Sequence, residues 1–573
     1  MTIRALFQKL MHGGAAWLLP AWVASVGPLP AAGQDYTFDT NTGSVTITRY
    51  HGSGGAVVVP PAINGLPVTA IGDAAFGFDS AITSVTIADS VTNLGQIVFI
   101  SCTSLTNVFL PASVTGIGEL TFKNCFNLAA ITVASNNPAF STASGVLFNK
   151  NHTTLVQYPQ GKGGEDYIVP ARVRTIASGA FYNCGSLTQV ALPAGLRNIG
   201  DAAFYGCLGL AHALLPEGVT NLGTQAFLNC QSLTQMTIPD SVISLGEEAF
   251  NSCGRLTNVI VGNRVTSIAS STFTDCSSLA SAVLGRGVTS IGEGAFEYCS
   301  ALSHLTLGRN LTCIGADAFS YCFSLPAITL PQGLKTIDSG AFQFCSGLTT
   351  VNLPASLDTI GDRVFEFCSG LIDFTVDSHN PAYASIDGVL FDRRLARLLQ
   401  YPVANPRSSY TLPAGTAGVA DTAFVSAFNL TSITIPASVT NLETLAFYDC
   451  SEVTGFFFEG APPALGDNVF DLDAAAAVYY LAGTRNWGST FDGLPTALWD
   501  PSAQAAPTRS SLQPFGFNIT GVPNTPLVVE ASTNLGAGPW MRLACITLTN
   551  GQFYFSDSQA TNYPGRFYRF RSP

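Results

Sequence analysis

A cysteine that returns at a constant interval constrains the fold of this chain more than any other feature. The step is 23 throughout a run of nine cysteines, which are Cys184, Cys207, Cys230, Cys253, Cys276, Cys299, Cys322, Cys345 and Cys368. Cys102 and Cys125 share the step, and Cys450 recurs later in the chain. Each of these cysteines has a phenylalanine three positions before it. Because only a unit of constant length keeps a residue pair at a constant interval, the chain must contain a repeated structural unit.

The phenylalanine of this pair recurs more widely than the cysteine. It marks 15 turns in all, including those at Phe76, Phe424 and Phe470, where the cysteine is absent. A period of about 20 to 29 residues is typical of a leucine-rich-repeat solenoid, in which each unit buries its apolar face against its neighbours. We therefore expect a curved, β-rich leucine-rich-repeat solenoid.

The unit at residues 105–127 shows what each turn should contain. Val108 and Leu110 alternate with outward-facing positions, which indicates a strand, and Pro111 ends it because proline cannot donate a hydrogen bond to a sheet. The segment 119–125 that follows predicts a short helical turn, which places the repeated phenylalanine in the core. The expected fold is therefore a stack of strands joined by short helical turns.

Two turns are longer by the same amount and carry matching sequences. Phe122 and Phe181 are as far apart in the sequence as Phe365 and Phe424, and both intervals exceed two ordinary repeats. Both inserts contain a Gly-Val-Leu-Phe run and a Gln-Tyr-Pro run. We therefore predict two related hairpin inserts, within residues 128–180 and 371–423.

The remaining segments divide the chain into further parts. Residues 1–33 combine a basic start, a short apolar stretch and small residues, as expected of a signal peptide that is removed on export. Alternating strands predict an N-terminal β cap at residues 34–65, in front of a solenoid at 66–499. Residues 500–511 are predicted to be a linker, and the strand-like runs of 512–573 predict a small all-β module.

The charge of the chain argues against several kinds of partner. The formal net charge is −12 and no block is rich in lysine and arginine, so nucleic acid is not an expected partner. No segment after the signal is apolar for long enough to cross a bilayer, so we expect no transmembrane segment in the mature chain. Arg566, Arg569 and Arg571 make the last residues basic, which suggests attachment to an anionic surface or to an export component.

The repeat resembles the BspA-like family of bacterial surface leucine-rich-repeat proteins. The unit L-T-x-V-x-L-P-x-S-V-T-x-I-G-x-x-A-F-x-x-C stands almost intact at Leu233–Cys253, and the resemblance covers residues 62–470. It implies a curved solenoid, export, and adhesion or protein binding at the cell surface, and it brings no catalytic residues. The segment 530–535 and the ending 567–569 resemble the small β-modules of exported bacterial proteins.

The cysteines and histidines are not spaced as a metal site or a catalytic site requires. Zinc sites need clustered ligands, whereas these cysteines stand one full repeat apart and the six histidines are scattered. No Gly-x-Ser-x-Gly or His-Glu-x-x-His motif occurs. We therefore expect no cofactor, no metal and no enzymatic activity.

The repeated cysteines are interpreted as free thiols on the inside of each turn, where a small apolar group with a weak donor fits. Disulfides between neighbouring turns are geometrically conceivable, since their Cα atoms would be about 5 Å apart. Pairing would, however, strain a regular backbone and make its register uneven.

The outward-facing strand positions form the candidate binding face. Most of them are uncharged, and Asp373 is the one acidic residue among the positions assigned to it. The face is either a hydrated sheet surface chosen for β-propensity or a polar binding surface anchored by Phe109, His212 and His304. The candidate binding residues are Asn107, Phe109, Gln189, His212, Gln235, Asn258, His304, Asn352 and Asp373.

These observations predict a secreted or cell-surface binding protein that recognises an extracellular protein or glycan through its solenoid. A self-associating surface scaffold is the alternative, which an exposed apolar patch or an uncapped strand edge would favour. A more remote alternative is an accessory to a secreted polysaccharide-acting enzyme. A cleft beside the C-terminal module that holds perturbed carboxylates would favour that third function.

Overall fold

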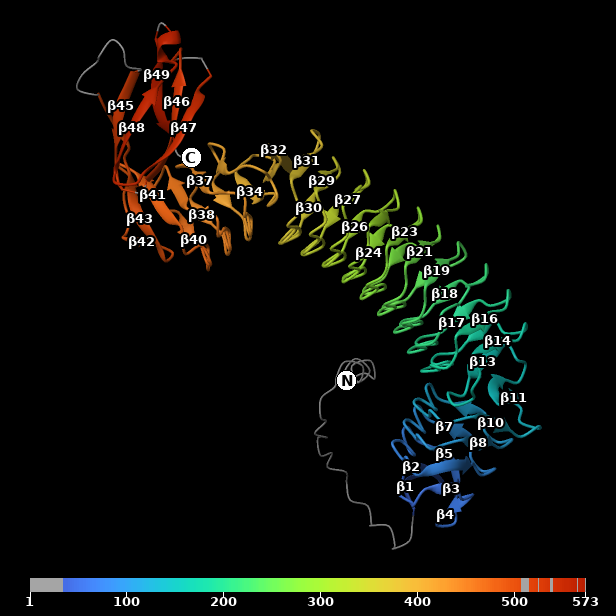
Figure 1. The fold of residues 1–573 in the computed structure, drawn as a ribbon. Coiled ribbons are helices and arrows are strands. Elements are labelled where there is room, and N and C mark those ends of the chain that lie inside the picture. Colours follow the sequence, from blue (N-terminus) through green and yellow to red (C-terminus); the bar gives the residue numbers. More distant parts are fainter. Residues whose placement is uncertain (1–34, 506–514, 524, 536–538, 564, 572–573) are drawn as a thin grey trace.

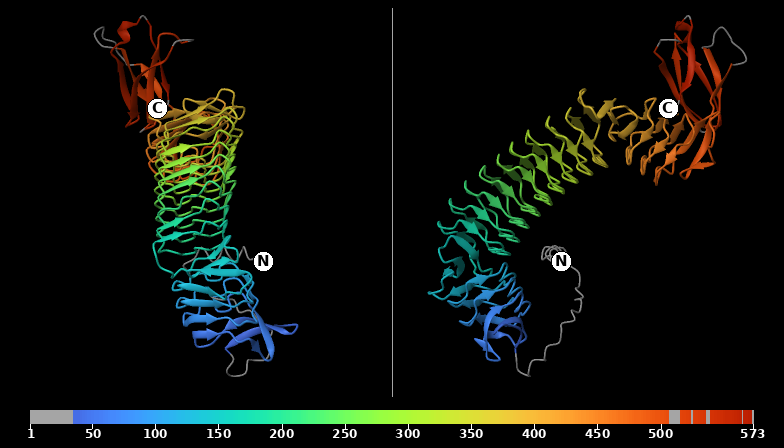
Figure 2. Two further views of the ribbon diagram at one scale, coloured as in Figure 1. Left: turned by 90° about the vertical axis from the view of Figure 1, so that its right-hand side faces the viewer. Right: turned by 180° about the vertical axis from the view of Figure 1, so that it is seen from behind.

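The computed structural model describes residues 35–505, 515–523, 525–535, 539–563 and 565–571. They form an arc of stacked coils that carries a small all-β module at its C-terminal end (Figure 1). The two further views in Figure 2 show the same arc from the side and from behind. The predicted β-rich solenoid is thus confirmed, whereas the predicted signal peptide at residues 1–33 lies outside the described residues.

The stack begins with an antiparallel pair and continues with parallel strands. β1 pairs with β2 in antiparallel orientation, and β2 pairs with β5 in parallel orientation. The strands before the first insert are β1 (Tyr36–Asn41), β2 (Ser44–Tyr50), β3 (Gly55–Val58), β4 (Ala62–Ile63), β5 (Leu66–Ile71), β6 (Ile82–Thr86), β7 (Asn93–Leu94), β8 (Asn107–Leu110), β9 (Gly116–Ile117) and β10 (Ala130–Val133). The predicted N-terminal cap therefore continues the sheets of the solenoid, and its boundary stays a prediction.

Most central coils contribute one longer strand to an outer sheet and one two-residue strand to an inner sheet. The longer strands are β14 (Asp166–Ile168), β16 (Gln189–Ala191), β19 (Gln235–Ile238), β21 (Asn258–Val261), β23 (Ser281–Val283), β25 (His304–Thr306), β29 (Thr350–Leu353) and β31 (Asp373–Val376). The two-residue strands are β15 (Thr175–Ile176), β17 (Asn198–Ile199), β18 (Asn221–Leu222), β20 (Ser244–Leu245), β22 (Ser267–Ile268), β24 (Ser290–Ile291), β26 (Cys313–Ile314), β27 (Ala327–Ile328), β28 (Thr336–Ile337) and β30 (Thr359–Ile360), of which β27 pairs with the longer strand β29. In Figure 1 the longer strands β19, β21 and β23 follow the convex side of the arc, and β24 and β26 lie nearer its concave side.

The last coils repeat this arrangement after the second insert. β35, β37, β39, β41 and β43 pair in sequence. The two-residue strands β36, β38 and β40 pair with one another in a second sheet. Their bounds are β35 (Ser409–Thr411), β36 (Gly418–Val419), β37 (Ser432–Ile435), β38 (Asn441–Leu442), β39 (Gly455–Phe458), β40 (Ala464–Leu465), β41 (Ala477–Leu481), β42 (Thr490–Phe491) and β43 (Leu494–Trp499).

The segment around the repeated phenylalanine is not helical, so the predicted helical turns are wrong. Leu120 and Asn124, which flank Phe122 at two positions on either side, have φ values of 53° and 60°, and the corresponding positions of the other coils are also left-handed. The Phe99 N–H donates to the Thr121 carbonyl oxygen of the next coil at 2.9 Å. A helix satisfies its hydrogen bonds within itself, whereas this segment bonds to the next coil and so extends the stack.

The threonines of the repeat bind each coil to the one before it. The hydroxyl of Thr257 donates to the carbonyl oxygen of Thr234, 23 residues earlier, at 2.9 Å. Thr289 and Thr312 extend a second ladder of the same kind at 3.0 and 2.9 Å. The sequence pattern alone gave no role to these threonines. Each bond adds a side-chain contact between coils to the backbone hydrogen bonds of the sheets.

The buried core of the stacked coils consists mainly of three large clusters, and the inserts lie between them. Leu147 of the first insert packs in the N-terminal cluster, whereas its neighbours Val146 and Phe148 pack in the central cluster. In the second insert Leu390 packs in the central cluster, and Val389 and Phe391 pack in the C-terminal one. Because side chains alternate along a strand, a single strand can face two cores.

Each insert is an antiparallel three-stranded unit, one strand more than the hairpin that the sequence predicted. β11 (Phe140–Ala143), β12 (Val146–Asn149) and β13 (Thr154–Gln157) form the first, and β32 (Tyr383–Ile386), β33 (Val389–Asp392) and β34 (Arg397–Gln400) form the second. After each unit a fully buried tyrosine takes the place of the repeated phenylalanine. Tyr158 stacks on Phe181 at 5.2 Å, and Tyr401 stacks on Phe424 at 5.0 Å, between ring centroids.

The C-terminal module consists of two three-stranded sheets. They are formed by β44 (Ser502–Ala505), β45 (Phe515–Thr520) and β48 (Gln552–Asp557), and by β46 (Thr525–Ser532), β47 (Met541–Leu548) and β49 (Phe567–Arg571), with the 3-10 helix η1 (Ala560–Asn562) between β48 and β49. β44 lies within the predicted linker at 500–511. Its backbone nevertheless pairs with β45, so this strand belongs to the module. The module therefore starts earlier than its composition suggested. Residues 506–511 of the predicted linker lie outside the described residues.

The arginines at the end of the module pair with carboxylates. Arg566 pairs with Asp557 at 2.6 Å, and both side chains are buried. Arg569 and Arg571 both pair with Glu530, at 2.7 and 3.0 Å. The three arginines of the predicted basic tail thus share two carboxylates of the module, which offset part of their charge, and Arg569 and Arg571 stay partly exposed.

Candidate functional site

The nine candidate binding residues lie on the longer strands, in two rows that run along the stack. Backbone pairing aligns Gln189 with Asp166 and with His212, and it aligns Gln235, Asn258, Ser281 and His304 with one another. Asp373 continues this first row through its pairing with Thr350. A partner that spans several coils would therefore meet these side chains as a line.

The first row is polar and partly exposed. Gln189, His212, Gln235 and His304 are exposed, whereas Asn107, Asn258 and Asp373 are half-buried. Asn107 belongs to the N-terminal segment, where it pairs with Ser84 and Ala130, so the first insert separates it from the other members. The structure therefore brings six of the seven predicted members of this row into the central segment.

Asp166 belongs to the same row, although the sequence pattern did not point to it. It pairs with Gln189 and is exposed. Asp373 is consequently not the one acidic residue of the face. Asp166 stands 23 residues before Gln189, but it lies within residues 128–180, which the sequence assigned to the first insert rather than to a regular coil.

The second row carries apolar side chains that the prediction left out. Phe109 and Asn352 are its predicted members, and they lie in different segments of the solenoid. Between them, four aliphatic side chains stand out from the sheet: Ile168, Leu214, Ile260 and Val283, which are 78%, 79%, 43% and 38% exposed. An alternation of buried and exposed strand positions predicts where such residues point. It does not predict that exposed positions will be apolar.

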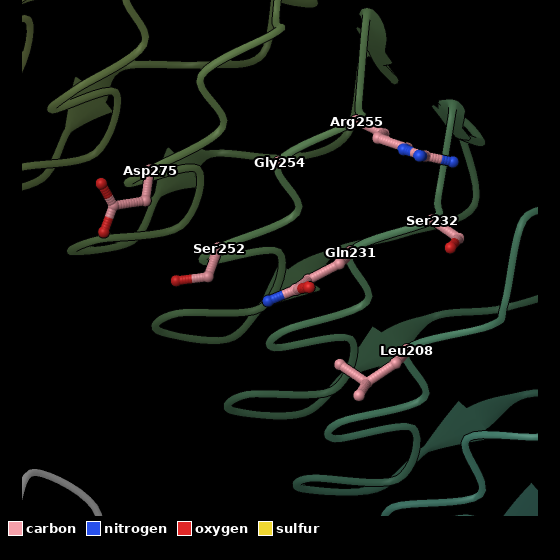
Figure 3. Close-up of a pocket in the computed structure, with 7 residues that line it drawn as sticks. All are labelled: Leu208, Gln231, Ser232, Ser252, Gly254, Arg255 and Asp275. Atoms are coloured by element: carbon pink, nitrogen blue, oxygen red, sulfur yellow. The ribbon is translucent and has the colours of Figure 1, made fainter.

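A further groove lies on another part of the coil. It measures about 470 Å³ and follows the loops beside the repeated cysteines, where Leu208, Gln231, Ser252, Arg255 and Asp275 line it. Figure 3 shows these side chains coming from successive coils, with Arg255 and Asp275 extending away from one another. None of the nine predicted binding residues lines this groove.

Each insert leaves a cavity where it interrupts the sheet of two-residue strands. The first measures about 310 Å³ and the second about 220 Å³. In the second, Arg363 pairs with Asp421 at 2.7 Å and Arg397 pairs with Glu443 at 2.5 Å. Two of the charged groups that line the cavity, Arg363 and Arg397, are thus paired with carboxylates of the protein itself.

A groove of about 240 Å³ separates the last coils from the C-terminal module. Phe457, Tyr479 and Trp499 line it together with Arg569 and Arg571. Among the described residues that line it, Glu459 alone carries a carboxylate. Glycoside hydrolysis uses a pair of carboxylates, so this groove lacks the feature that would have favoured a polysaccharide-acting enzyme.

The cysteine column is buried, as predicted, and its thiols are bonded to the backbone. Cys253 donates to the Phe227 carbonyl oxygen at 3.3 Å, and the same bond recurs in most of the other coils. Burial raises the pKa of Cys207 and of Cys253 to about 12. A thiol with so high a pKa is a poor nucleophile and a poor metal ligand near neutral pH.

Within the part of the chain that the structure describes, no three histidine, cysteine or acidic side chains come together as a metal site would need. The same residues include no helix with the length and apolar character that a membrane span requires.

The family model described as "BspA type Leucine rich repeat region (6 copies)" matches residues 64–155, 164–280, 266–387 and 406–477, more than half of the chain. No curated protein matches the chain. Several solved structures are similar to it. A leucine-rich repeat protein from Bacteroides ovatus is 19% identical, with a TM-score of 0.46, over 82% of this chain and 100% of that one.

Two further structures are similar over part or most of the chain. A leucine rich cell surface protein from Faecalibacterium prausnitzii is 20% identical, with a TM-score of 0.32, over 83% of this chain and 95% of that one. The pneumococcal vaccine antigen PcpA is 18% identical, with a TM-score of 0.36, over 57% of this chain and 97% of that one.

Proposed function

The chain belongs to the BspA-type leucine-rich-repeat family, and from this premise we propose that it is a non-catalytic binding protein that acts outside the cell. Its ligand in this proposal is a protein, held on the sheet of longer strands. The basic start and apolar stretch of residues 1–33 support export. The absence of an acid, base or nucleophile cluster from the nine predicted binding residues supports binding rather than catalysis.

The exposed apolar row is the observation that carries this proposal. Ile168, Ile260 and Val283 leave aliphatic side chains in water on the strands β14, β21 and β23, and Leu214 stands in the same row two residues after the bridged His212. Exposed apolar side chains that gather on one face mark contact surfaces for proteins, and a rim of polar residues is usual around them. Gln189, His212, Gln235 and His304 supply such a rim in the neighbouring row.

A binding screen with row variants tests the proposal. The chain from residue 35 onward is immobilised and exposed to extracellular proteins and polysaccharides of the native environment. We expect a protein ligand that the double variant Leu214→Glu/Ile260→Glu no longer retains, since each added carboxylate would have to be buried in the contact. Ile243→Glu is the matched control, because Ile243 is 47% exposed but lies outside the row.

Equal retention by the wild type and the double variant would contradict the proposed face. Capture of polysaccharides alone would contradict a protein ligand.

Self-association through the same row is a second candidate function. The exposed aliphatic side chains are the feature that a self-associating scaffold requires. Sedimentation of the purified chain alone separates the two functions. A scaffold would form concentration-dependent assemblies that Leu214→Glu/Ile260→Glu disperses, whereas a binding protein would stay monomeric until its ligand is added.

A further inference from the structure

Four aromatic rings stack on the surface of the central segment, on a different part of the coil from the binding sheet. Tyr298, Tyr321, Phe344 and Phe367 occupy one position in four successive coils, two places after the buried phenylalanine. Their ring centroids are separated by 4.6, 4.4 and 4.8 Å. Tyr298 is 41% exposed, and Phe323, which is 45% exposed, meets Tyr321 edge to face at 5.9 Å. We call these five residues the aromatic ladder.

The backbone at the ladder does not favour aromatic residues. φ lies between 56° and 60° at Tyr298, Tyr321, Phe344 and Phe367. The five coils before the ladder in the central segment carry small residues here, namely Asn183, Gly206, Asn229, Ser252 and Asp275, which tolerate the left-handed region better. The ladder therefore places bulky side chains where the fold alone would prefer small ones, and such strain is commonly found at functional surfaces.

The carboxylates beside the ladder set the charge of a partner. Asp275, Glu297 and Asp317 belong to the same three coils as Phe273, Phe296 and Phe319. Burial and the carboxylates of Asp317, Asp275 and Glu293 raise the pKa of Glu297, so these groups repel one another. Among the described residues no basic side chain forms an ion pair with Asp275, Glu297 or Asp317, and Arg255 extends away from Asp275 (Figure 3).

We propose that the aromatic ladder is the docking surface for a basic, extended segment of a partner protein. Charge complementarity selects that occupant. Lysine or arginine side chains of the segment would neutralise the carboxylates, and their apolar stems would cover the ring edges. The ring of Tyr298 ends the stack on the side of Asp275, which leaves one aromatic face for a cation. This surface is separate from the sheet of the proposed function and does not depend on it.

The probe is a labelled dodecapeptide of alternating lysine and serine. It is titrated with the chain from residue 35 onward at constant ionic strength. The aromatic variant is Tyr298→Asn/Tyr321→Asn, which should fold because Asn229 already holds this position. The charge variant is Glu297→Gln/Asp317→Asn. Each is expected to weaken binding about tenfold or more.

One control variant loses as many carboxylates as the charge variant, and one control peptide has the same length as the probe. Glu217→Gln/Glu247→Gln removes two exposed carboxylates elsewhere in the central segment and should leave the affinity within about twofold. A dodecapeptide of alternating glutamate and serine should not bind. Unchanged affinity in the aromatic variant, or an equal loss in the Glu217/Glu247 control, would overturn the proposal. Ladder-dependent binding of a neutral oligosaccharide with no binding of the basic peptide would also overturn it.

Discussion

The thiol of Cys276 donates a hydrogen bond to the carbonyl oxygen of Phe250, 26 residues earlier, at 3.2 Å. The thiol therefore bonds to the phenylalanine of the preceding coil, whereas the backbone N–H of Cys276 donates to the carbonyl oxygen of Phe273 in its own coil at 3.2 Å. Both residues of the Phe-x-x-Cys signature act between coils: the ring stacks on the neighbouring ring, and the thiol reaches back to the neighbouring backbone. The repeat spacing that revealed the solenoid is thus also the spacing of the bonds that hold it.

The thiols of the cysteine column are predicted to be reduced and unreactive in the native protein. Burial raises the pKa of Cys253 to about 12, so almost no thiolate is present near pH 7. A thiol reagent should label the exposed Cys545 quickly, Cys313 more slowly, and the column cysteines after denaturation without reductant. If the denatured, unreduced protein offered almost no thiols, disulfides would connect the coils instead.

Removal of one stacked ring should destabilise the solenoid locally. Phe273 is fully buried between Phe250 and Phe296, with ring centroids 5.4 and 5.1 Å away. Phe273→Ala should cost about 3–5 kcal/mol because it leaves a cavity in a close-packed core. Hydrogen exchange should accelerate mainly in the adjacent coils, since coupling in a solenoid is between nearest neighbours.

Phe323→Ala is the control for this change, since Phe323 is 45% exposed and should cost far less. Uniform acceleration of exchange along the whole stack would show that the coils unfold as one unit.

The sequence predicted the parts of the fold that repeat and missed those that do not. The period predicted the coils, the strands and the buried columns, and the match of residues 64–155, 164–280, 266–387 and 406–477 confirms the family. Asp166 and Tyr158 were not predicted because both lie within residues 128–180, which were assigned to the first insert, although each stands one 23-residue step before its partner in the next coil. The sequence did not predict the exposed apolar row, because the exposure of Leu214 depends on the neighbouring coils, which lie a full repeat away in the sequence.

The helical turn was predicted for a reason that the structure makes clear. A phenylalanine followed three positions later by a cysteine has the spacing of one helical face, and nothing in one coil opposes that interpretation. The left-handed residues at Leu120 and Asn124 instead turn the backbone toward the next coil, where its N–H and C=O groups find partners. Local patterns cannot reveal hydrogen bonds made between repeats.

The last coil should lose stability as the pH rises. Asp473 stands in the cysteine column, one repeat after Cys450, and its side chain is buried. Burial raises the pKa of Asp473 from 3.8 to about 8. The folded state therefore binds a proton more tightly than the unfolded chain, so stability is greatest below about pH 4 and falls until about pH 8, by roughly 1.4 kcal/mol per pH unit at most.

The comparison of Asp473 with an uncharged variant isolates this effect. Urea unfolding of the wild type should weaken between pH 5 and pH 9 relative to Asp473→Asn, which has no carboxylate to ionise. Asp473→Cys, which restores the column, should behave like the asparagine variant. Parallel pH profiles for all three proteins would show that the carboxyl of Asp473 does not titrate in this range.

The solenoid is predicted to fold without the C-terminal module, although Trp499 joins the two. The indole N–H of Trp499 donates to the Pro526 carbonyl oxygen at 3.4 Å, and its ring meets Phe457 edge to face at 6.0 Å. A chain that ends after Asp500 loses the first contact and keeps the second. The strands β39, β41 and β43 also keep their mutual pairing. Its circular dichroism should therefore stay β-rich, and its Tm should stay within a few degrees of that of the full chain.

Trp499 fluorescence should shift to the red, because one face of the ring becomes exposed, and this shift serves as the internal control that the module has been removed. If the truncated solenoid unfolded, the module would be a cap that the last coils need, and the proposed division of the chain near residue 500 would be wrong.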